Sequence, residues 1–250
     1  MPEAISAALA VPGLGWMMLA ISAAGLVRGF TGFDTALIFV PVAGQFLAAA
    51  DVIMVMAVTG LFSMVALVPG AWKTADRGEV ASLAIAAALC VPVGVWILSQ
   101  LDVLTIRWIV SVVVAMTLVA VMTGWRWRGR LGWSGRFAIG AGAGTMGGMT
   151  GLTGPVVIIF YLANARSAEH VRANTILFLA ALDLVLVVNL ALFGHARPEV
   201  VWIAVVMALP YLGATLIGQA LFDPRLEKAY RIVAYGVVAL ALVSGVPALD

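Results

Sequence analysis

The chain has 250 residues, of which 64 % are apolar and only 10 % charged, whereas soluble domains run nearer half apolar and a quarter charged. This composition argues against a soluble enzyme and a disordered protein, and a net charge of +2 is too small for a nucleic-acid-binding surface. One cysteine excludes an intrachain disulfide framework, and two histidines leave little room for a zinc site. The composition is typical of a polytopic membrane protein.

Ten apolar segments follow one another and are separated by short polar connections. They cover roughly residues 7–27, 33–48, 52–69, 79–98, 104–123, 136–147, 154–164, 171–193, 199–218 and 228–247. A helix rises about 1.5 Å per residue, so about 20 residues are needed to cross the hydrocarbon core. The third, fourth, fifth, eighth, ninth and tenth segments are therefore predicted to be full spans. The second, sixth and seventh are too short to cross upright. No Lys or Arg precedes Arg28, so we predict a first membrane segment at the start rather than a cleaved signal peptide.

Glycine- and threonine-containing breaks, at residues 29–32 and 147–154, join the first segment to the second and the sixth to the seventh. The sequence GFTGFDTALIFVP (29–41) aligns with GMTGLTGPVVIIF (148–160) at an offset of 119 residues, and RGEV (77–80) aligns with RPEV (197–200) at an offset of 120. The matched pairs include Gly29 with Gly148, Thr31 with Thr150, Gly32 with Gly151, Gly94 with Gly213 and Gln100 with Gln219. Matched glycines and charges favour a real repeat over chance similarity among apolar segments, and such repeats are typical of transporters.

The repeat divides the chain into three parts. We predict a first transmembrane repeat over residues 1–123, a basic cytoplasmic linker over 124–136 and a second transmembrane repeat over 137–250. If the chain reverses at each break, each repeat crosses the membrane an odd number of times and the repeats are inverted. With the linker inside, this arrangement places eleven Lys and Arg inside and two outside, with Arg28 uncounted, whereas parallel repeats give seven and six. Cytoplasmic loops carry an excess of Lys and Arg, so the count favours inversion.

The predicted fold class is therefore an all-α polytopic membrane protein with two inverted structural repeats. Each repeat has a broken or re-entrant helix pair and three spanning helices, and both termini are predicted to be periplasmic. The charge count does not distinguish short helices that cross fully from re-entrant hairpins. The 136–147 and 154–164 segments would each reach only about 18 Å, which favours hairpins.

The two breaks are also the predicted binding site. Irregular backbone at membrane depth is tolerated only where protein or a water-filled cavity satisfies its polar groups. Each break is followed by the start of a short helix, whose free N–H groups suit an anion, and threonine hydroxyls add further donors. The residues predicted to bind the solute are Arg28, Thr31, Gly32, Phe33, Thr150, Gly151, Thr153 and Gly154. The alternative is that these glycines and threonines serve only close helix packing.

Three ionisable residues lie at the first break or inside a span. Arg28 would bind the anion bidentately or pair with Asp34, unless it reaches the cytoplasmic headgroups. Asp34 is either a cap of the following helix or a carrier of a coupling proton or cation. Asp183 falls in the middle of a span, with Asn189, polar groups of the other repeat or a coupling proton as its expected partner. We assign Asp34 and Asp183 to coupling, and we expect Asn174 and Asn189 to form hydrogen bonds between helices.

The residues around both breaks resemble a known family. VRGFTGFDTALIFVPV (27–42) and GGMTGLTGPVVIIFYLANARSAEHVRANTILF (147–178) resemble the paired glycine-rich motifs of the TauE/SafE sulfite exporter family, and the resemblance covers about residues 12–245. It implies a bacterial inner-membrane transporter of sulfite, sulfoacetate or related organosulfur anions. The chain departs from the family's common pattern at Asp34 and Thr153, where the family commonly has glycine. The added acid at the first break indicates proton coupling or a different ligand.

Together these features predict a secondary transporter that moves a small anion across the bacterial inner membrane by alternating access, with a proton or cation as its coupling partner. No nucleotide-binding or hydrolase motif occurs, so we expect no enzyme activity, no cofactor and no metal. The alternatives are a non-transporting membrane scaffold subunit and an intramembrane enzyme. The sequence leaves open the substrate, the direction of transport, the coupling ion and whether the chain forms a homodimer in the lipid bilayer.

Overall fold

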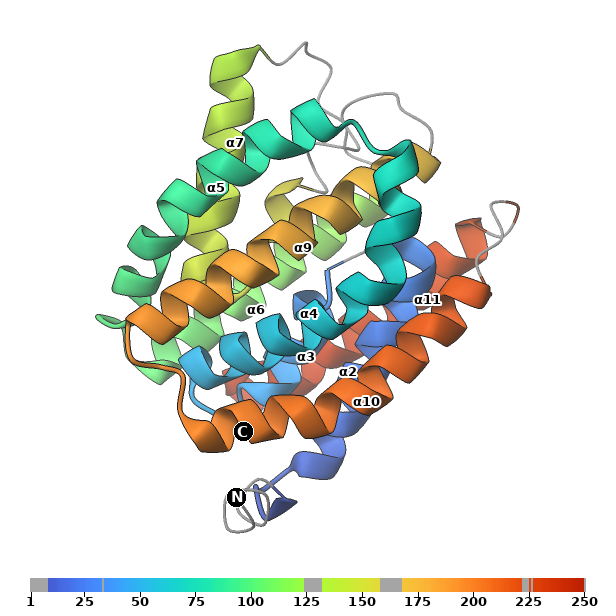
Figure 1. Cartoon of the computed structure of the whole chain (residues 1–250). Coiled ribbons are helices and arrows are strands. Elements are labelled where there is room, and N and C mark those ends of the chain that lie inside the picture. Colours follow the sequence, from blue (N-terminus) through green and yellow to red (C-terminus); the bar gives the residue numbers. More distant parts are fainter. Residues whose placement is uncertain are drawn as a thin grey trace.

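The computed structural model describes residues 9–32, 34–123, 132–157, 168–221, 225 and 227–249, and within these ranges every regular element is a helix. In chain order the helices are α2 (Leu14–Thr31), α3 (Ala36–Ala43), α4 (Ala49–Thr74), α5 (Arg77–Leu98), α6 (Val103–Met122), α7 (Trp133–Thr150), α9 (Ala168–Leu192), α10 (Pro198–Ala220), α11 (Glu227–Gly245) and the short 3-10 helix η2 (Pro247–Leu249). Residues 154–157 are also helical. Figure 1 shows the helices packed side by side in one bundle, which confirms the predicted all-helical fold.

Six of these helices are long and apolar enough to cross a membrane, namely α2, α4, α5, α6, α9 and α10. Five of them correspond to predicted full spans. Helix α2 joins them because it has 18 residues and continues to Thr31, beyond the predicted end at residue 27. In α11, which corresponds to the tenth predicted segment, the described apolar stretch is Ile232–Gly245.

Helix α7 is longer than the sequence predicts. It covers 18 residues, about 27 Å at the helical rise, where the hydropathy pattern gives only 136–147. Small residues occupy the face that α7 turns to α5. A Cβ added to Gly140, Gly144 or Gly148 would collide with atoms of α5. Because small residues let two helix backbones approach closely, α7 is stabilised by this contact although it has few aliphatic side chains.

Helix α2 packs on α10 as α7 packs on α5. A Cβ on Gly29 would lie 2.8 Å from the Cα of Gly218, and a Cβ on Gly148 would lie 3.0 Å from the Cα of Gly94. In these contacts Gly218 takes the position that Gly94 takes in the other helix pair, whereas the sequence alignment matches Gly94 with Gly213. A Cβ on Gly213 would have no neighbour within 4 Å in the described part of the chain. The residues at the two breaks are thus 119 positions apart in the sequence, whereas the glycines of α5 and α10 that contact α7 and α2 are 124 positions apart.

Contacts between helix termini define two ends of the bundle. At one, which we call the Asp51 end, the Asp51 carboxylate at the start of α4 pairs with Arg197 at the start of α10. At the other, the Glu79 end, the Asn174 side chain near the start of α9 accepts a hydrogen bond from Asp76 N (2.8 Å) and donates one to Glu79 Oε1 (3.2 Å). Since α10 follows directly on α9, helices α4 and α9 run in opposite directions between the two ends (Figure 1).

The short helix α3 returns to the end from which α2 starts. Gly13, just before α2, lies against the ring of Phe46, just after α3. Gly44, at the end of α3, lies beside the side chain of Arg107 near the start of α6. Helix α7 instead starts at the Glu79 end, where Arg136 Nη2 lies 3.7 Å from Glu79 Oε2. The α2–α3 pair and α7 therefore enter the bundle from opposite ends.

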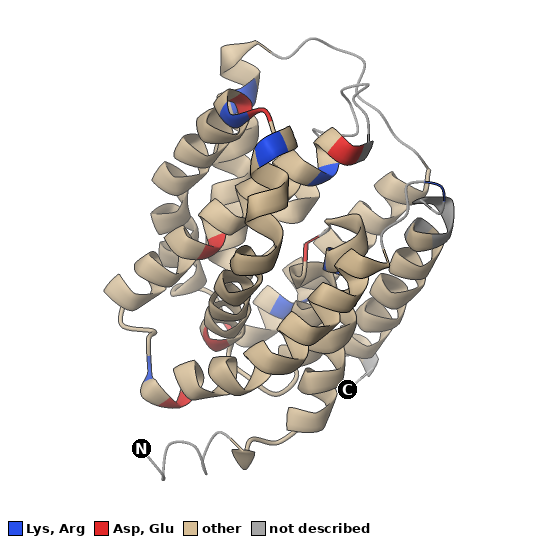
Figure 2. Ribbon diagram, turned by 45° about the vertical axis from the view of Figure 1, so that its right-hand side comes forward, with Lys and Arg blue, Asp and Glu red and all other residues tan. Residues whose placement is uncertain are grey.

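Charged residues gather toward the two ends of the bundle, with few between them (Figure 2). The Glu79 end has Lys73, Arg77, Arg136 and Arg172, and the Asp51 end has Arg107 and Arg197. Between the ends, Arg28, Asp34 and Asp183 are buried. These three residues are the charged centre of the molecule.

Candidate functional site

Both breaks end a helix with the same backbone geometry. Gly32 follows α2 with a φ of 73°, and Gly151 follows α7 with a φ of 79°, in the left-handed region that glycine adopts without a Cβ clash. Their N–H groups donate to Arg28 O and Gly147 O, both at 2.8 Å. This is a glycine C-cap. Two positions 119 residues apart thus stop two helices, and the chain turns away after each.

The threonines before these glycines use their hydroxyl groups within their own helices. Thr31 donates to Val27 O at 2.6 Å, and Thr150 donates to Met146 O at 2.8 Å. Thr150 Oγ1 also accepts a hydrogen bond from Leu152 N at 3.2 Å. We expected both hydroxyls to donate to the solute; in this conformation each proton is already engaged.

One carboxylate connects the two breaks. Asp34, two residues after Gly32, is only 3 % exposed. Its Oδ1 accepts a hydrogen bond from Ala36 N at the start of α3 (3.1 Å), and its Oδ2 accepts from Gly154 N (2.6 Å) and from Thr153 Oγ1 (3.3 Å). The starts of both short helices therefore face the same carboxylate. Asp34 therefore precedes the N-cap Thr35 of α3, accepts a hydrogen bond from the first N–H of that helix and reaches across to the second break.

Arg28, in the last turn of α2, is 2 % exposed, so it does not reach the headgroups. Its Nη2 lies 3.3 Å from Asp183 Oδ2 on α9, and its Nη1 donates to Thr35 Oγ1 at 3.4 Å. The pairing with Asp34, one of the alternatives considered for Arg28, is not formed, because the ion-pair partner is the acid 155 residues later in the sequence. Gly60 of α4 leaves the space for that acid, since an added Cβ there would overlap the Asp183 carboxylate.

The Arg28 guanidinium retains unused hydrogen-bonding capacity. A guanidinium carries five N–H donors, and within the described ranges the Nε of Arg28 has no acceptor. The two contacts that it does make are long, at 3.3 and 3.4 Å. A buried positive group with spare donors is suited to an oxyanion, which can accept two of its N–H bonds at once.

Sequence reasoning missed two residues at this centre. Tyr211 of α10 is fully buried, and its Oη lies 2.8 Å from Thr35 Oγ1, which links α10 to the first break. The available signal was a tyrosine within an apolar span, because a buried phenol usually has a hydrogen-bond partner. Arg172, counted only for topology, donates from Nη2 to Gly29 O at 2.5 Å and packs against Gly32.

The remaining predicted residues have simpler surroundings. Phe33 lies outside the described residues. Gly151 faces apolar side chains, with methyl and methylene carbons 3.3–3.5 Å from an added Cβ. Asn174 forms the expected hydrogen bonds between helices, whereas Asn189 donates to Val185 O of its own helix at 2.8 Å.

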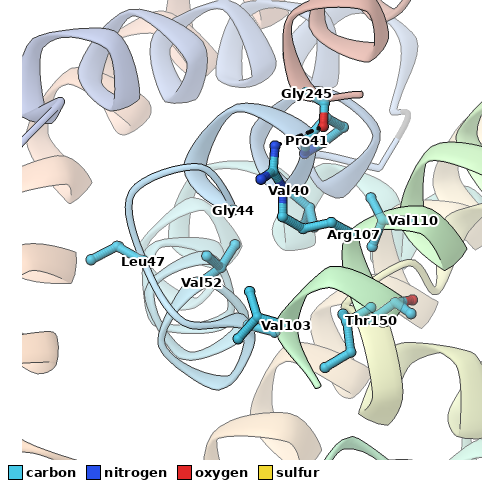
Figure 3. Close-up of a pocket in the computed structure, with 12 residues that line it drawn as sticks. Val40, Pro41, Gly44, Leu47, Val52, Val103, Arg107, Val110, Thr150 and Gly245 are labelled. Carbon is cyan, nitrogen blue, oxygen red and sulfur yellow. Dashed lines mark hydrogen bonds between the residues drawn. The ribbon is translucent and has the colours of Figure 1, made fainter. Parts of the chain in front are cut away.

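A small cavity lies on the Asp51 side of the second break (Figure 3). Residues of α3, α4 and α6 line it together with Thr150 and Gly245. Its volume is about 20 Å³, which is room for one water molecule and not for an anion of several atoms. Along one side the Arg107 Nη2 donates to Gly245 O at 3.3 Å (Figure 3). This cavity therefore borders the second break at Thr150, and none of the three residues of the charged centre lines it.

Comparison with protein families places these features in a known context. The family model described as Sulfite exporter TauE/SafE matches residues 17–245. This range contains both breaks and all the buried charged residues described above. Comparisons with curated proteins and with solved structures give no match.

Proposed function

Because the chain belongs to the sulfite exporter TauE/SafE family, we propose that it carries sulfite, a sulfonate or a related organosulfur or carboxylate anion across the bacterial inner membrane by alternating access. The family consists of membrane transporters, so the chain is a multi-pass membrane transporter and not an intramembrane enzyme. The substrate, the transport cycle and the coupling ion are the parts that we add.

The observation that carries the proposal is the buried centre at which both breaks meet. Arg28 supplies a positive charge with unused donors, and Gly154 N, Ala36 N and Thr153 Oγ1 converge on one point beside it. Oriented N–H and O–H donors around one guanidinium suit a small oxyanion. Ionisable residues inside a membrane span are rare and mark binding sites or ion pathways by default, which also favours a functional role for Arg28. The proposed solute-binding set remains Arg28, Thr31, Gly32, Phe33, Thr150, Gly151, Thr153 and Gly154.

Polar contacts at both ends support alternating access. The Asp51–Arg197 ion pair joins α4 to α10 at one end, and Asn174 joins α9 to Glu79 of α5 at the other. Each contact can be exchanged for water when its end opens. The antiparallel course of α4 and α9 and the reciprocal packing of α2 on α10 and α7 on α5 support two inverted repeats around the centre.

The charge distribution supports an orientation in the membrane. Basic residues are more numerous at the Glu79 end than at the Asp51 end, so we place the Glu79 end in the cytoplasm. Gly13, before α2, and η2, after α11, lie toward the Asp51 end, where η2 contacts α6. Both termini are then periplasmic.

The charges at the centre support proton coupling. Arg28, Asp34 and Asp183 together carry a net charge of −1 when all three are ionised. A singly charged anion that joins them changes the net charge from −1 to −2 in a buried environment, which is unfavourable. Protonation of one acid removes the added charge, so we assign Asp34 and Asp183 to proton coupling.

Efflux from proteoliposomes tests the transport proposal. Vesicles loaded with sulfite and containing the full chain should release it faster than protein-free vesicles. Arg28→Met should reduce efflux to the protein-free rate because it removes the positive charge that pairs with Asp183 and is proposed to bind the anion. Arg77→Met is the matched control, since Arg77 is an exposed arginine at the Glu79 end, and it should leave efflux unchanged. Wild-type efflux equal to that of protein-free vesicles, for sulfite and for methanesulfonate, would exclude sulfite and simple sulfonates as substrates.

A further inference from the structure

The carboxylate of Asp34 takes the position that the two breaks offer to a solute. Its two oxygens accept hydrogen bonds from the backbone on both sides, from Ala36 N and from Gly154 N, and from the Thr153 hydroxyl. A carboxylate and a sulfur oxyanion present the same chemistry to such donors, namely negatively charged oxygens a short distance apart. The chain therefore holds one of its own anions among the donors of its binding site.

The fit around Asp34 leaves no space for a second anion at these donors. A Cβ added to Gly154 would overlap the Asp34 Cβ and lie 2.7 Å from Oδ2. The carboxylate thus occupies the space that the missing side chain of Gly154 leaves open. A solute oxygen can reach Gly154 N only after Asp34 has moved.

The surrounding charges determine when Asp34 can move. The ionisable groups around it are Arg28 on α2, Asp183 on α9 and Tyr211 on α10, which belong to one electrostatic cluster. Arg28 is engaged by Asp183 at 3.3 Å, and its Nε has no acceptor among the residues that the structure describes. An ionised Asp34 competes with a solute for the same donors and repels it, whereas a protonated Asp34 accepts these hydrogen bonds weakly and does not repel it.

We propose that Asp34 is a built-in competitor of the transported anion, which binds only when Asp34 has taken up a proton and left the donors of the two breaks. The proposal rests on the proposed function and assigns to Asp34 the control of that site. One proton from water is then bound for each anion, and it remains on the Asp34 carboxyl group while the anion is bound. When the anion leaves, the proton is released and the carboxylate returns to Gly154 N.

Binding of sulfite to the purified full chain in detergent, measured by calorimetry between pH 5.5 and 8.5, tests this proposal. Sulfite itself changes protonation in this range, but this change is the same for every variant. The ratio of the dissociation constants of two variants therefore reports only the titration of the protein. We expect the sulfite dissociation constant of wild type, divided by that of Asp34→Ala, to rise with pH. The rise should approach tenfold per pH unit, as for one linked proton. Asp34→Asn keeps the shape and removes the titration, so its ratio to Asp34→Ala should be constant with pH. Asp102→Asn, at an exposed carboxylate, should behave as wild type.

The outcomes separate this proposal from the transport proposal. A ratio that is constant with pH, or weaker binding by Asp34→Ala than by wild type throughout the pH range, would overturn the competitor role while leaving anion binding intact. Should Asp34→Ala fail to fold, the comparison of wild type with Asp34→Asn gives the same pH-dependent ratio. Infrared difference spectra add a second readout, because sulfite binding should produce a protonated carboxyl band in wild type that Asp34→Asn lacks. If no variant binds sulfite at any pH, the proposed function and this proposal fail together.

Discussion

The ion pair between Arg28 and Asp183 gives the sharpest test of the buried centre. Both side chains are almost fully buried, with 3 % and 7 % exposure, and their charged atoms are 3.3 Å apart. Removing one partner of a buried pair leaves an uncompensated charge and typically costs about 3–5 kcal/mol. At about 2–4 °C per kcal/mol for a chain of this size, Arg28→Met should lower the melting temperature by roughly 6–20 °C.

A double-mutant cycle makes the prediction specific to the pair. Asp183→Asn alone leaves Arg28 without its carboxylate, whereas the combination with Arg28→Met leaves two neutral groups. The loss in the double variant should therefore be clearly smaller than the sum of the single losses. The assay is thermal unfolding of the purified chain in detergent, followed by tryptophan fluorescence at constant pH.

A pair with only one buried partner supplies the comparison for this cycle. Arg197 is 59 % exposed and its partner Asp51 is 8 % exposed, so the Arg197 guanidinium is largely solvated and Arg197→Met should cost less than Arg28→Met, whose pair is buried on both sides. Strictly additive losses in the Arg28 and Asp183 cycle, or single losses as small as that of Arg197→Met, would refute the pairing of a buried charge at the centre.

Three further predictions concern packing, coupling and the second break. Gly148→Ala should lower the free energy of unfolding by about 1–3 kcal/mol, because its Cβ would collide with α5. Gly213→Ala has open space around its Cβ, so it should be neutral or stabilise the chain by up to about 1 kcal/mol. Equal losses of the two variants in thermal unfolding would favour the 119-residue offset along α10. Asp183→Asn removes a negative charge that interacts with Asp34, and this loss favours the ionised form of Asp34. The pH at which sulfite efflux declines should therefore move downward. An unchanged pH profile would limit Asp183 to its ion pair with Arg28. Thr150→Val combined with Gly151→Leu should stop efflux, because leucine is strained at a φ of 79°, and unchanged flux would remove the second break from the site.

Much of the fold could be predicted because it depends on local patterns. The predicted apolar segments agree with most helix boundaries within a few residues, and the two breaks were found because glycine and threonine interrupt an apolar pattern. Helix α7 was underestimated, since its packing surface consists of glycines that hydropathy scores poorly. Length and composition thus identify helices that face lipid better than helices that pack closely on a neighbour.

The register along α10 could not be predicted from residue identity. The sequence matches Gln100 with Gln219, but in the structure Gly29 contacts the backbone of Gln219 as Gly148 contacts that of Val95. The position of closest approach decides which glycine is equivalent, and that position depends on helix packing rather than on the sequence of α10 itself. Matching identical residues therefore gave an offset that does not describe the positions at which α5 and α10 contact α7 and α2.

The partners of the buried charges were likewise beyond reach, because each lies far away in the sequence and on another helix. Asp183 is joined to Arg28 across 155 residues, and Asp34 is joined to Gly154 across 120. Sequence reasoning could state that each charge needs a partner, but the residues it named were Asp34 for Arg28 and Asn189 for Asp183. The choice depends on the space at Gly60, which only the structure reveals.

These long-range contacts have a consequence for the two predicted repeats. Each break is completed by the other half of the chain: Asp34 accepts from Gly154 N of the second half, while Arg172 of the second half donates to Gly29 O at the end of α2. A half that folded alone would leave these backbone groups without partners inside the membrane, where each unsatisfied group costs several kcal/mol. The breaks are therefore stable only when both halves meet, and a movement that separates the halves must give the exposed groups new partners. A bound anion and its accompanying water can be those partners, so the same donors that hold the halves together in the closed form are available to the solute when the site opens.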